Sequence, residues 1–133
     1  MTRIALVAPL LALRAGLSAL LDAAGLEAHW QASSLAEVES HLDESDVFVL
    51  CAGGISRTEL RTLLKNTDGR LALLLLVDGA QEIPDLIDLP LRAWGILPLE
   101  ATEAELAAAI RALDEGLLVS APALAQLSLG RNT

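Results

Sequence analysis

The residues that could do chemistry in this chain follow short apolar runs. In an open α/β sheet, reacting groups stand just beyond the carboxyl ends of the strands. Where the runs end, the sequence reads Ala8-Pro9, Cys51-Ala52-Gly53, Val77-Asp78 and Pro98-Leu99. No acid, hydroxyl or lysine occupies the positions at which a catalytic group is expected. The sequence therefore favours packing and contact with a partner over turnover.

Cys51 is the one nucleophile in a suggestive place, at the end of an apolar run and before Gly53 and Gly54. A reactive thiol normally needs a nearby base or cation that lowers its pKa. His29 and His41 belong to the expected second strand and second helix, away from this place. We therefore expect Cys51 to be a small buried core residue, and we expect no enzyme activity.

Other candidate ligands lack the spacing that a site requires. His29 and His41 have no partners at metal-ligand spacing, so solvated or hydrogen-bonded side chains are the better interpretation. The acidic turn at 43–46 lacks the loop length of a calcium site. Gly53-Gly54 is not followed by a phosphate-binding lysine and is not part of G-x-G-x-x-G, which favours an ordinary turn. No metal or cofactor is predicted.

The composition indicates one acidic domain with an aliphatic core. The 133 residues are 53% hydrophobic but 2% aromatic, and the formal net charge is −9 with Lys65 as the single lysine. Such a chain repels phosphate backbones, so these residues alone should bind neither DNA nor an anionic membrane. A lone cysteine excludes an intrachain disulfide. The apolar start imitates a signal peptide, but Arg14 interrupts it, and we expect a cytoplasmic protein.

Strand and helix patterns alternate along the chain. We expect strands at 3–7, 26–30, 47–51, 71–77 and 95–97, with a helix at 10–24 and further helices after capping boxes at 34–37, 56–59 and 102–105. The runs 47–50 and 71–77 are apolar throughout, which is typical of central parallel strands covered on both faces. Pro84 and Pro90 predict a short or distorted helix in the segment 79–93. This alternation predicts a parallel sheet with helices on both faces.

Four stretches, at 13–17, 46–51, 95–106 and 116–124, together match a known kind of domain in order and spacing. The stretch 13–17 resembles the first helix after an acidic pocket, and 46–51 resembles the strand that ends in a phosphorylated Asp. The stretch 95–106 resembles the fifth strand with its following helix, and 116–124 resembles a short segment specific to one subfamily. On these residues the chain, over about 3–127, resembles the receiver domain of LuxR-type response regulators. The resemblance implies a three-layer, flavodoxin-like fold with five parallel strands in the order 2-1-3-4-5.

The functional positions of that family are replaced here. Ala8 and Pro9 stand where family members have the acids that hold magnesium, and Cys51 stands at the phosphoacceptor position. The lysine position falls on Leu99, the aromatic switch position on Ile96, and no hydroxyl lies within 75–77. Aspartyl phosphorylation needs a carboxylate, oxygen ligands for magnesium and a cation. We therefore predict a degenerate receiver, or pseudo-receiver, that cannot take phosphate.

The resemblance implies a phosphorylation-independent regulatory and dimerisation module of a transcription regulator. We expect a receiver-like domain at 1–127 and the start of a linker or a loose tail at 128–133. No DNA-binding helix-turn-helix is visible, so the chain is expected to be a fragment that reaches DNA only through a domain not present here. The Ala- and Leu-rich first and last helices favour a homodimer, and a sensor kinase or another regulatory protein is a further expected partner.

Three alternatives stay open at this point. The chain could be a stand-alone adaptor that uses the same fold to bind a sensor kinase or other regulator. It could also be an enzyme that depends on Cys51, which we rank below both regulatory functions. Trp94 could be an exposed anchor for a partner or a partly buried core residue.

Overall fold

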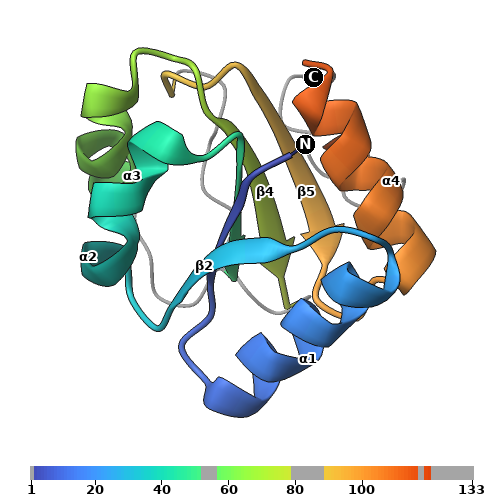
Figure 1. Ribbon diagram of the computed structural model, residues 1–133. Helices are drawn as coiled ribbons and strands as arrows, with labels where there is room; N and C mark the ends of the chain where they lie inside the picture. Colours follow the sequence, from blue (N-terminus) through green and yellow to red (C-terminus); the bar gives the residue numbers. More distant parts are fainter. Residues whose placement is uncertain (1, 52–56, 79–88, 117–118, 121–133) are drawn as a thin grey trace.

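The computed structural model describes residues 2–51, 57–78, 89–116 and 119–120 (Figure 1). Its strands are β1 (Ile4–Val7), β2 (Ala28–Ala32), β3 (Val47–Cys51), β4 (Ala72–Val77), β5 (Ala93–Pro98) and β6 (Val119–Ser120). Its helices are α1 (Leu11–Ala23), α2 (Leu35–Val38), α3 (Arg57–Leu64) and α4 (Glu103–Asp114), with 3-10 helices η1 (Glu39–Glu44) and η2 (Lys65–Thr67). Ser56 of the second capping box, most of the segment 79–93, and the tail 128–133 lie outside the described residues.

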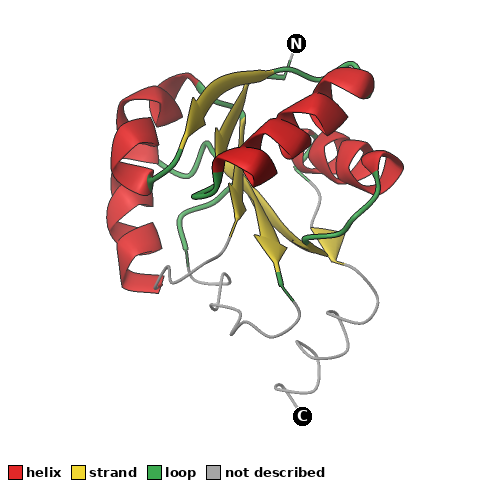
Figure 2. Ribbon diagram, turned by 90° about the horizontal axis from the view of Figure 1, so that it is seen from below, coloured by secondary structure: helices red, strands yellow, loops and turns green. Residues whose placement is uncertain are grey.

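All strand pairs in the sheet are parallel, and the order is β2-β1-β3-β4-β5-β6. The predicted order 2-1-3-4-5 is therefore confirmed, and the two-residue β6 extends the sheet beyond β5. Helices α1 and α4 cover one face, and α2 and α3 cover the other (Figures 1 and 2). The fold is the expected three-layer, flavodoxin-like α/β architecture.

The alternation of side chains along the strands divides the core in two. On the α1–α4 side, Leu6, Val49 and Leu74 pack in one buried cluster. On the α2–α3 side, Phe48 and Leu75 belong to the other. Because both faces of β1, β3 and β4 are covered, every residue of these strands is buried. β2 is half-buried, as expected for a strand at the edge of the sheet.

Helix α4 begins and ends as its sequence predicts. The Thr102 hydroxyl accepts a hydrogen bond from the Glu105 backbone N–H (3.2 Å), and the Glu105 carboxylate accepts one from the Thr102 N–H (3.0 Å). Gly116 follows the helix with φ +86°, a conformation in which an L side chain is strained. The capping box fixes the point at which the chain leaves β5, and so it places α4 against the sheet.

The capping box predicted at Ser34 is wrong. Ser34 is the N-cap residue of α2 but its side chain makes no capping hydrogen bond. Instead, the Glu37 carboxylate accepts hydrogen bonds from the Ser33 backbone N–H (2.9 Å) and from the Ser33 hydroxyl (3.1 Å). These bonds are made one residue earlier than the pattern indicates, and α2 passes after four residues into the 3-10 helix η1.

Candidate functional site

The sheet brings the predicted site residues to one edge. In the register of the parallel strands, Val7 lies beside Leu50, Cys51 beside Leu76, and Val77 beside Pro98. The residues that follow these positions therefore meet at the carboxyl edge, where α/β folds place their sites. Ala8, Cys51 and Leu99 lie at this edge, as the sequence predicts.

The carboxyl edge is apolar at these positions. Ala8, Cys51 and Val77 are buried, and Leu99 is half-buried against the core of the α1–α4 side. Pro9 is exposed. None of these side chains offers an oxygen ligand for a metal ion or a cation for phosphoryl oxygens. Within the described residues, no three His, Cys, Asp or Glu side chains gather in a way that could hold a metal ion.

Cys51 lies in an environment that suppresses thiolate chemistry. Its side chain is 5% exposed. Burial raises the pKa of the thiol from 9.0 to about 11, because the charged thiolate loses its hydration. Reactive cysteines have pKa values lowered by a cation, a base or a helix N-terminus. The position of Cys51 thus agrees with a core residue and opposes the enzyme alternative.

Charged residues do stand at this edge, among them Arg14 and Asp78, and sequence reasoning assigned neither of these two to a site. The Arg14 guanidinium, in the first turns of α1, donates a hydrogen bond of 2.9 Å to the Ala8 carbonyl oxygen. Asp78 follows β4 and its side chain is exposed. The signal for Arg14 was its interruption of an apolar helix start. This hydrogen bond links α1 to the residue that follows β1, where the resemblance places magnesium-binding acids.

The two histidines are not among the residues at the carboxyl edge. His29 lies in β2 and His41 in η1, and both rings contact Trp30 of β2. The Trp30 indole stacks on the His41 ring with 5.3 Å between ring centroids, and His29 lies tilted against Trp30 at 5.7 Å. Nδ1 of His29 lies 3.1 Å from the Glu27 carbonyl oxygen. These contacts support the interpretation of solvated or hydrogen-bonded histidines. Trp94 is half-buried against the core of the α2–α3 side, which matches the core alternative.

Charged groups gather instead at the amino edge of the sheet, where the strands begin. The Arg92 guanidinium donates to the carbonyl oxygens of Arg70 (3.1 Å) and Asp114 (2.7 Å) and lies 3.8 Å from the Asp114 carboxylate. The Thr2 hydroxyl donates to Asp114 as well (2.7 Å). Arg3 pairs with Asp46 and Arg70 with Asp43, so two acids of the turn before β3 take part in ion pairs at this edge.

Comparison with models of known protein families finds no match. A search of curated proteins also finds no similar sequence. No helix in the described part of the chain combines the length and the apolar character needed to cross a bilayer.

Solved structures, in contrast, match over nearly the whole chain. The response regulator ChrA of a heme-sensing two-component system has a TM-score of 0.74 and 26% identity over 97% of this chain and 64% of ChrA. A LuxR family DNA-binding response regulator from Silicibacter pomeroyi has a TM-score of 0.66 and 19% identity over 92% of this chain and 98% of its own. RcsB, solved as two dimers bound to two parallel DNAs, has a TM-score of 0.75 and 13% identity, covering 95% of this chain and 67% of RcsB.

These likenesses show the fold of the domain. Its fold is the receiver fold of response regulators, and the neighbours support a domain of a two-component regulator. This chain spans about two thirds of the length of ChrA and RcsB.

Proposed function

We propose that the chain is a pseudo-receiver: a regulatory and dimerisation module of a LuxR-type transcription regulator that works without phosphorylation. The observation that supports this most directly is the apolar carboxyl edge, where Ala8 and Cys51 are buried and Leu99 is half-buried at the positions that the resemblance assigns to phosphate chemistry. Pro9 completes the set of degenerate positions. Acids such as Asp78 stand near these strand ends, but within the described residues no three His, Cys, Asp or Glu side chains gather in a way that could hold magnesium.

The domain organisation belongs to the same proposal. Residues 1–127 form the receiver-like domain and 128–133 begin a linker or tail, with DNA bound through a domain outside this chain. The module works in the cytoplasm as a homodimer, without a cofactor and without catalysis of its own. A sensor kinase or another regulatory protein supplies the signal by contact, since the carboxyl edge offers no chemistry through which a phosphoryl group could do so.

A direct test is incubation with acetyl phosphate and magnesium, followed by intact mass measurement. We expect an unchanged mass, while a receiver domain with an intact aspartate in the same tube gains one phosphoryl group. A phosphoryl gain on this chain would refute the proposal. Peptide mapping of the gained group would then show whether Asp78 is the acceptor.

The second candidate function is a stand-alone adaptor with the same fold. The coding sequence after Thr133 separates the two candidates. A stop codon there supports the adaptor, and a continuing frame with a helix-turn-helix supports the transcription regulator.

A further inference from the structure

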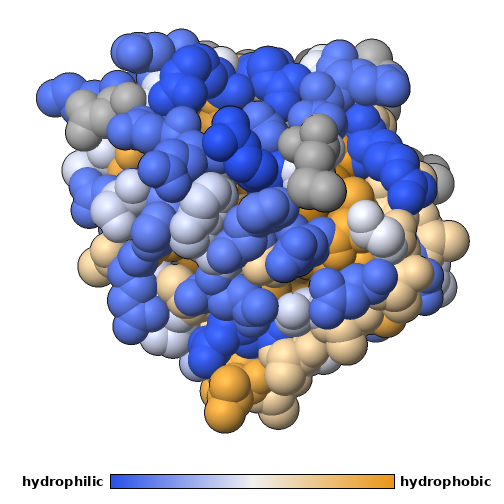
Figure 3. Space-filling model, viewed as in Figure 1, coloured by the Kyte–Doolittle hydropathy of each residue, from blue (hydrophilic) through white to orange (hydrophobic). Residues whose placement is uncertain are grey.

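A pocket of about 530 Å³ opens at the amino edge of the sheet, away from the carboxyl edge. It is lined by Asp22 at the end of α1, by Leu26 and Glu27 before β2, and by Arg111 of α4. In Figure 3, viewed as in Figure 1, an apolar area bordered by hydrophilic residues lies beside α4, where the chain passes from α1 to β2. The volume of the pocket is within the range of pockets that hold small molecules.

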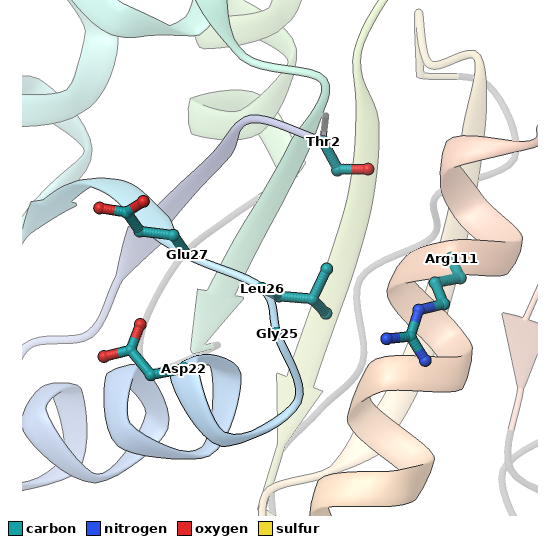
Figure 4. Close-up of a pocket in the computed structure, with 6 residues that line it drawn as sticks. All are labelled: Thr2, Asp22, Gly25, Leu26, Glu27 and Arg111. Carbon is teal, nitrogen blue, oxygen red and sulfur yellow. The ribbon is translucent and has the colours of Figure 1, made fainter.

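Opposite charges stand on two sides of this pocket. Figure 4 shows the carboxylates of Asp22 and Glu27 on one side and the Arg111 guanidinium on the other, with Leu26 between them. The two acids and the arginine are exposed, and Leu26 is half-buried, so all four side chains are open to a ligand. The pocket therefore offers two anionic groups, an apolar contact and a cationic group, in that order.

The pocket is built on backbone that is held in place. Where α1 ends, the Leu26 N–H donates to the Leu21 carbonyl oxygen (2.8 Å). Gly25 between them has φ +79°, the left-handed conformation with which helices commonly end. Nη2 of Arg111 donates to the Ala24 carbonyl oxygen (3.0 Å), which fixes the guanidinium beside the same turn. A ligand would meet groups that are already in position, so its binding would lose little free energy to ordering of the site.

The two acids stand where the fold does not favour them. Asp22 lies in the last turn of α1, whose carbonyl end carries partial negative charge, and that turn contains no basic residue. Glu27 places a second negative charge at the same pocket. Neither carboxylate makes a hydrogen bond or an ion pair within the described residues. Because these positions cost stability and no contact in the described part of the chain offsets the cost, the two acids point to a cationic group from outside the chain.

We propose that this pocket binds a small elongated zwitterion, such as a short peptide or an ω-amino acid. Its ammonium group binds the carboxylates of Asp22 and Glu27, and its apolar middle packs on Leu26. Its carboxylate accepts hydrogen bonds from the guanidinium of Arg111. A simple amine would leave Arg111 unused, and a simple carboxylate would meet two acids. Because Leu26 separates the charged groups of the pocket, the two charges of the ligand must also be separated, unlike those of a free α-amino acid. This site is additional to the proposed function.

The first experiment varies the ligand. The tripeptide Gly-Leu-Gly is titrated into the full chain, labelled with nitrogen-15 and without an N-terminal tag because Thr2 lines the pocket. We expect saturable shifts of the backbone amide signals at 22–27 and around 111, with a Kd of about 1 mM or below. The N-acetylated and the C-amidated tripeptide should each bind about fivefold more weakly, since each lacks one charge. L-leucine should also bind more weakly. Equal binding of 6-aminohexanoate and Gly-Leu-Gly assigns the ω-amino acid class, and weaker binding of 6-aminohexanoate assigns the peptide.

The second experiment changes the pocket. In Asp22→Asn with Glu27→Gln, N-acetylation of the tripeptide should no longer weaken binding, because the carboxylates that bind its ammonium group are gone. In Arg111→Gln, C-amidation should no longer weaken binding, and the Gln side chain retains an N–H donor for the bond to the end of α1. The control, Glu39→Gln with Glu44→Gln on η1, removes two charges on the opposite side of the sheet and should bind Gly-Leu-Gly as the wild type does.

A third measurement separates a binding role from a structural one. Asp22→Asn should raise the Tm by about 2 °C, because it relieves repulsion at the end of α1, and should weaken binding at the same time. The inference is overturned if Gly-Leu-Gly gives no saturable shift up to about 10 mM, or if both blocked tripeptides bind as the free one does. It is also overturned if the variant without the two acids binds Gly-Leu-Gly as the wild type does. If Arg111→Gln fails to fold, the blocked tripeptides on the wild-type chain decide.

Discussion

The two edges of the sheet differ in how they use polar side chains. At the amino edge, Arg3, Arg70 and Arg92 each pair with an acid, and the guanidinium groups of Arg70 and Arg92 also donate to backbone carbonyl oxygens. At the carboxyl edge, Cys51 and Leu99 fill the corresponding space with apolar atoms. The contrast shows that polar side chains are not simply scarce in this chain. They are placed where they fix the loops, and they are missing where phosphate chemistry would need them.

The difference has an energetic basis. Ion pairs at the amino edge are partly exposed, so each contributes little by itself, but the bonds to backbone groups hold loop positions. Acids clustered at the carboxyl edge would repel one another and lose hydration unless a cation joined them. An apolar edge avoids that cost, and it stabilises the domain at the expense of chemistry. Each of the following variants tests one side of this contrast.

The largest effect should follow from returning an acid to the carboxyl edge. We expect Cys51→Asp to lower the free energy of unfolding by about 3 kcal/mol at neutral pH, because a buried carboxylate stands there without a partner. Burial raises the pKa of this Asp in the folded state, so the loss should shrink as the pH falls through the raised folded pKa toward the unfolded pKa, and it should stay constant below that. Urea unfolding at several pH values measures it.

The matched control is Cys51→Ala, which removes the thiol without adding charge and should cost about 1 kcal/mol with little dependence on pH below 8. If Cys51→Asp is as stable as the wild type, or takes phosphate from acetyl phosphate, the edge is not the inert apolar surface described above.

Cys51 should react slowly with iodoacetamide. With a pKa of about 11 in place of 9.0, its thiolate fraction at neutral pH falls about 100-fold, since each unit is a factor of ten. The alkylation rate in the folded protein should rise toward pH 11, and urea should abolish the protection. Because the folded pKa is raised, the stability linked to this thiol is present below pH 9 and is lost as the pH rises toward 11. Fast alkylation at pH 7 would instead support the alternative function, an enzyme that depends on Cys51.

Arg92 and Arg14 allow a direct comparison between the two edges. Arg92→Ala removes bonds to two carbonyl oxygens and an ion pair, and should cost about 1.5 kcal/mol after allowance for partial exposure. Arg14→Ala removes one bond to Ala8 and should cost about 0.5 kcal/mol. Thermal or urea unfolding ranks the two. If Arg14→Ala lowers the free energy of unfolding more than Arg92→Ala does, the carboxyl edge depends on the Arg14 guanidinium more than its single hydrogen bond indicates.

Most of the fold follows from the sequence because its signals are local and repeated. Unbroken apolar runs mark β3 and β4 as strands buried on both faces, and the helical spacing of Leu106, Ile110 and Leu113 identifies the inner face of α4. The order of the strands came from the resemblance, since periodicity gives no register between distant segments. The capping box at Ser34 misled because Ser33 stands next to it and offers Glu37 the same two groups.

The site was predictable in its positions but not in its contacts. Sequence order placed Ala8, Cys51 and Leu99 at one edge, since parallel strands end together. It could not show that Arg14 reaches the Ala8 carbonyl, because that bond depends on the path of the turn between β1 and α1. The pocket lined by Asp22, Leu26, Glu27 and Arg111 could not be predicted from the sequence for the same reason. Its residues come from segments that are adjacent only after folding.

The polar groups that remain near the carboxyl edge should serve helix starts, and substitutions at two N-cap residues test this. Thr102→Ala removes the cap of α4 and should cost about 1 kcal/mol, whereas Ser34→Ala should cost almost nothing, because Ser34 makes no capping bond. Hydrogen bonds from the Thr102 backbone and side chain lower the pKa of Glu105 below 4.5. The contribution of this box to stability is therefore present above pH 4.5 and is lost as the pH falls through the lowered folded pKa. Glu105→Gln should remove this pH-dependent part of the free energy of unfolding. An equal loss of stability in Ser34→Ala and Thr102→Ala would contradict the assignment of Thr102, and not Ser34, as a capping side chain.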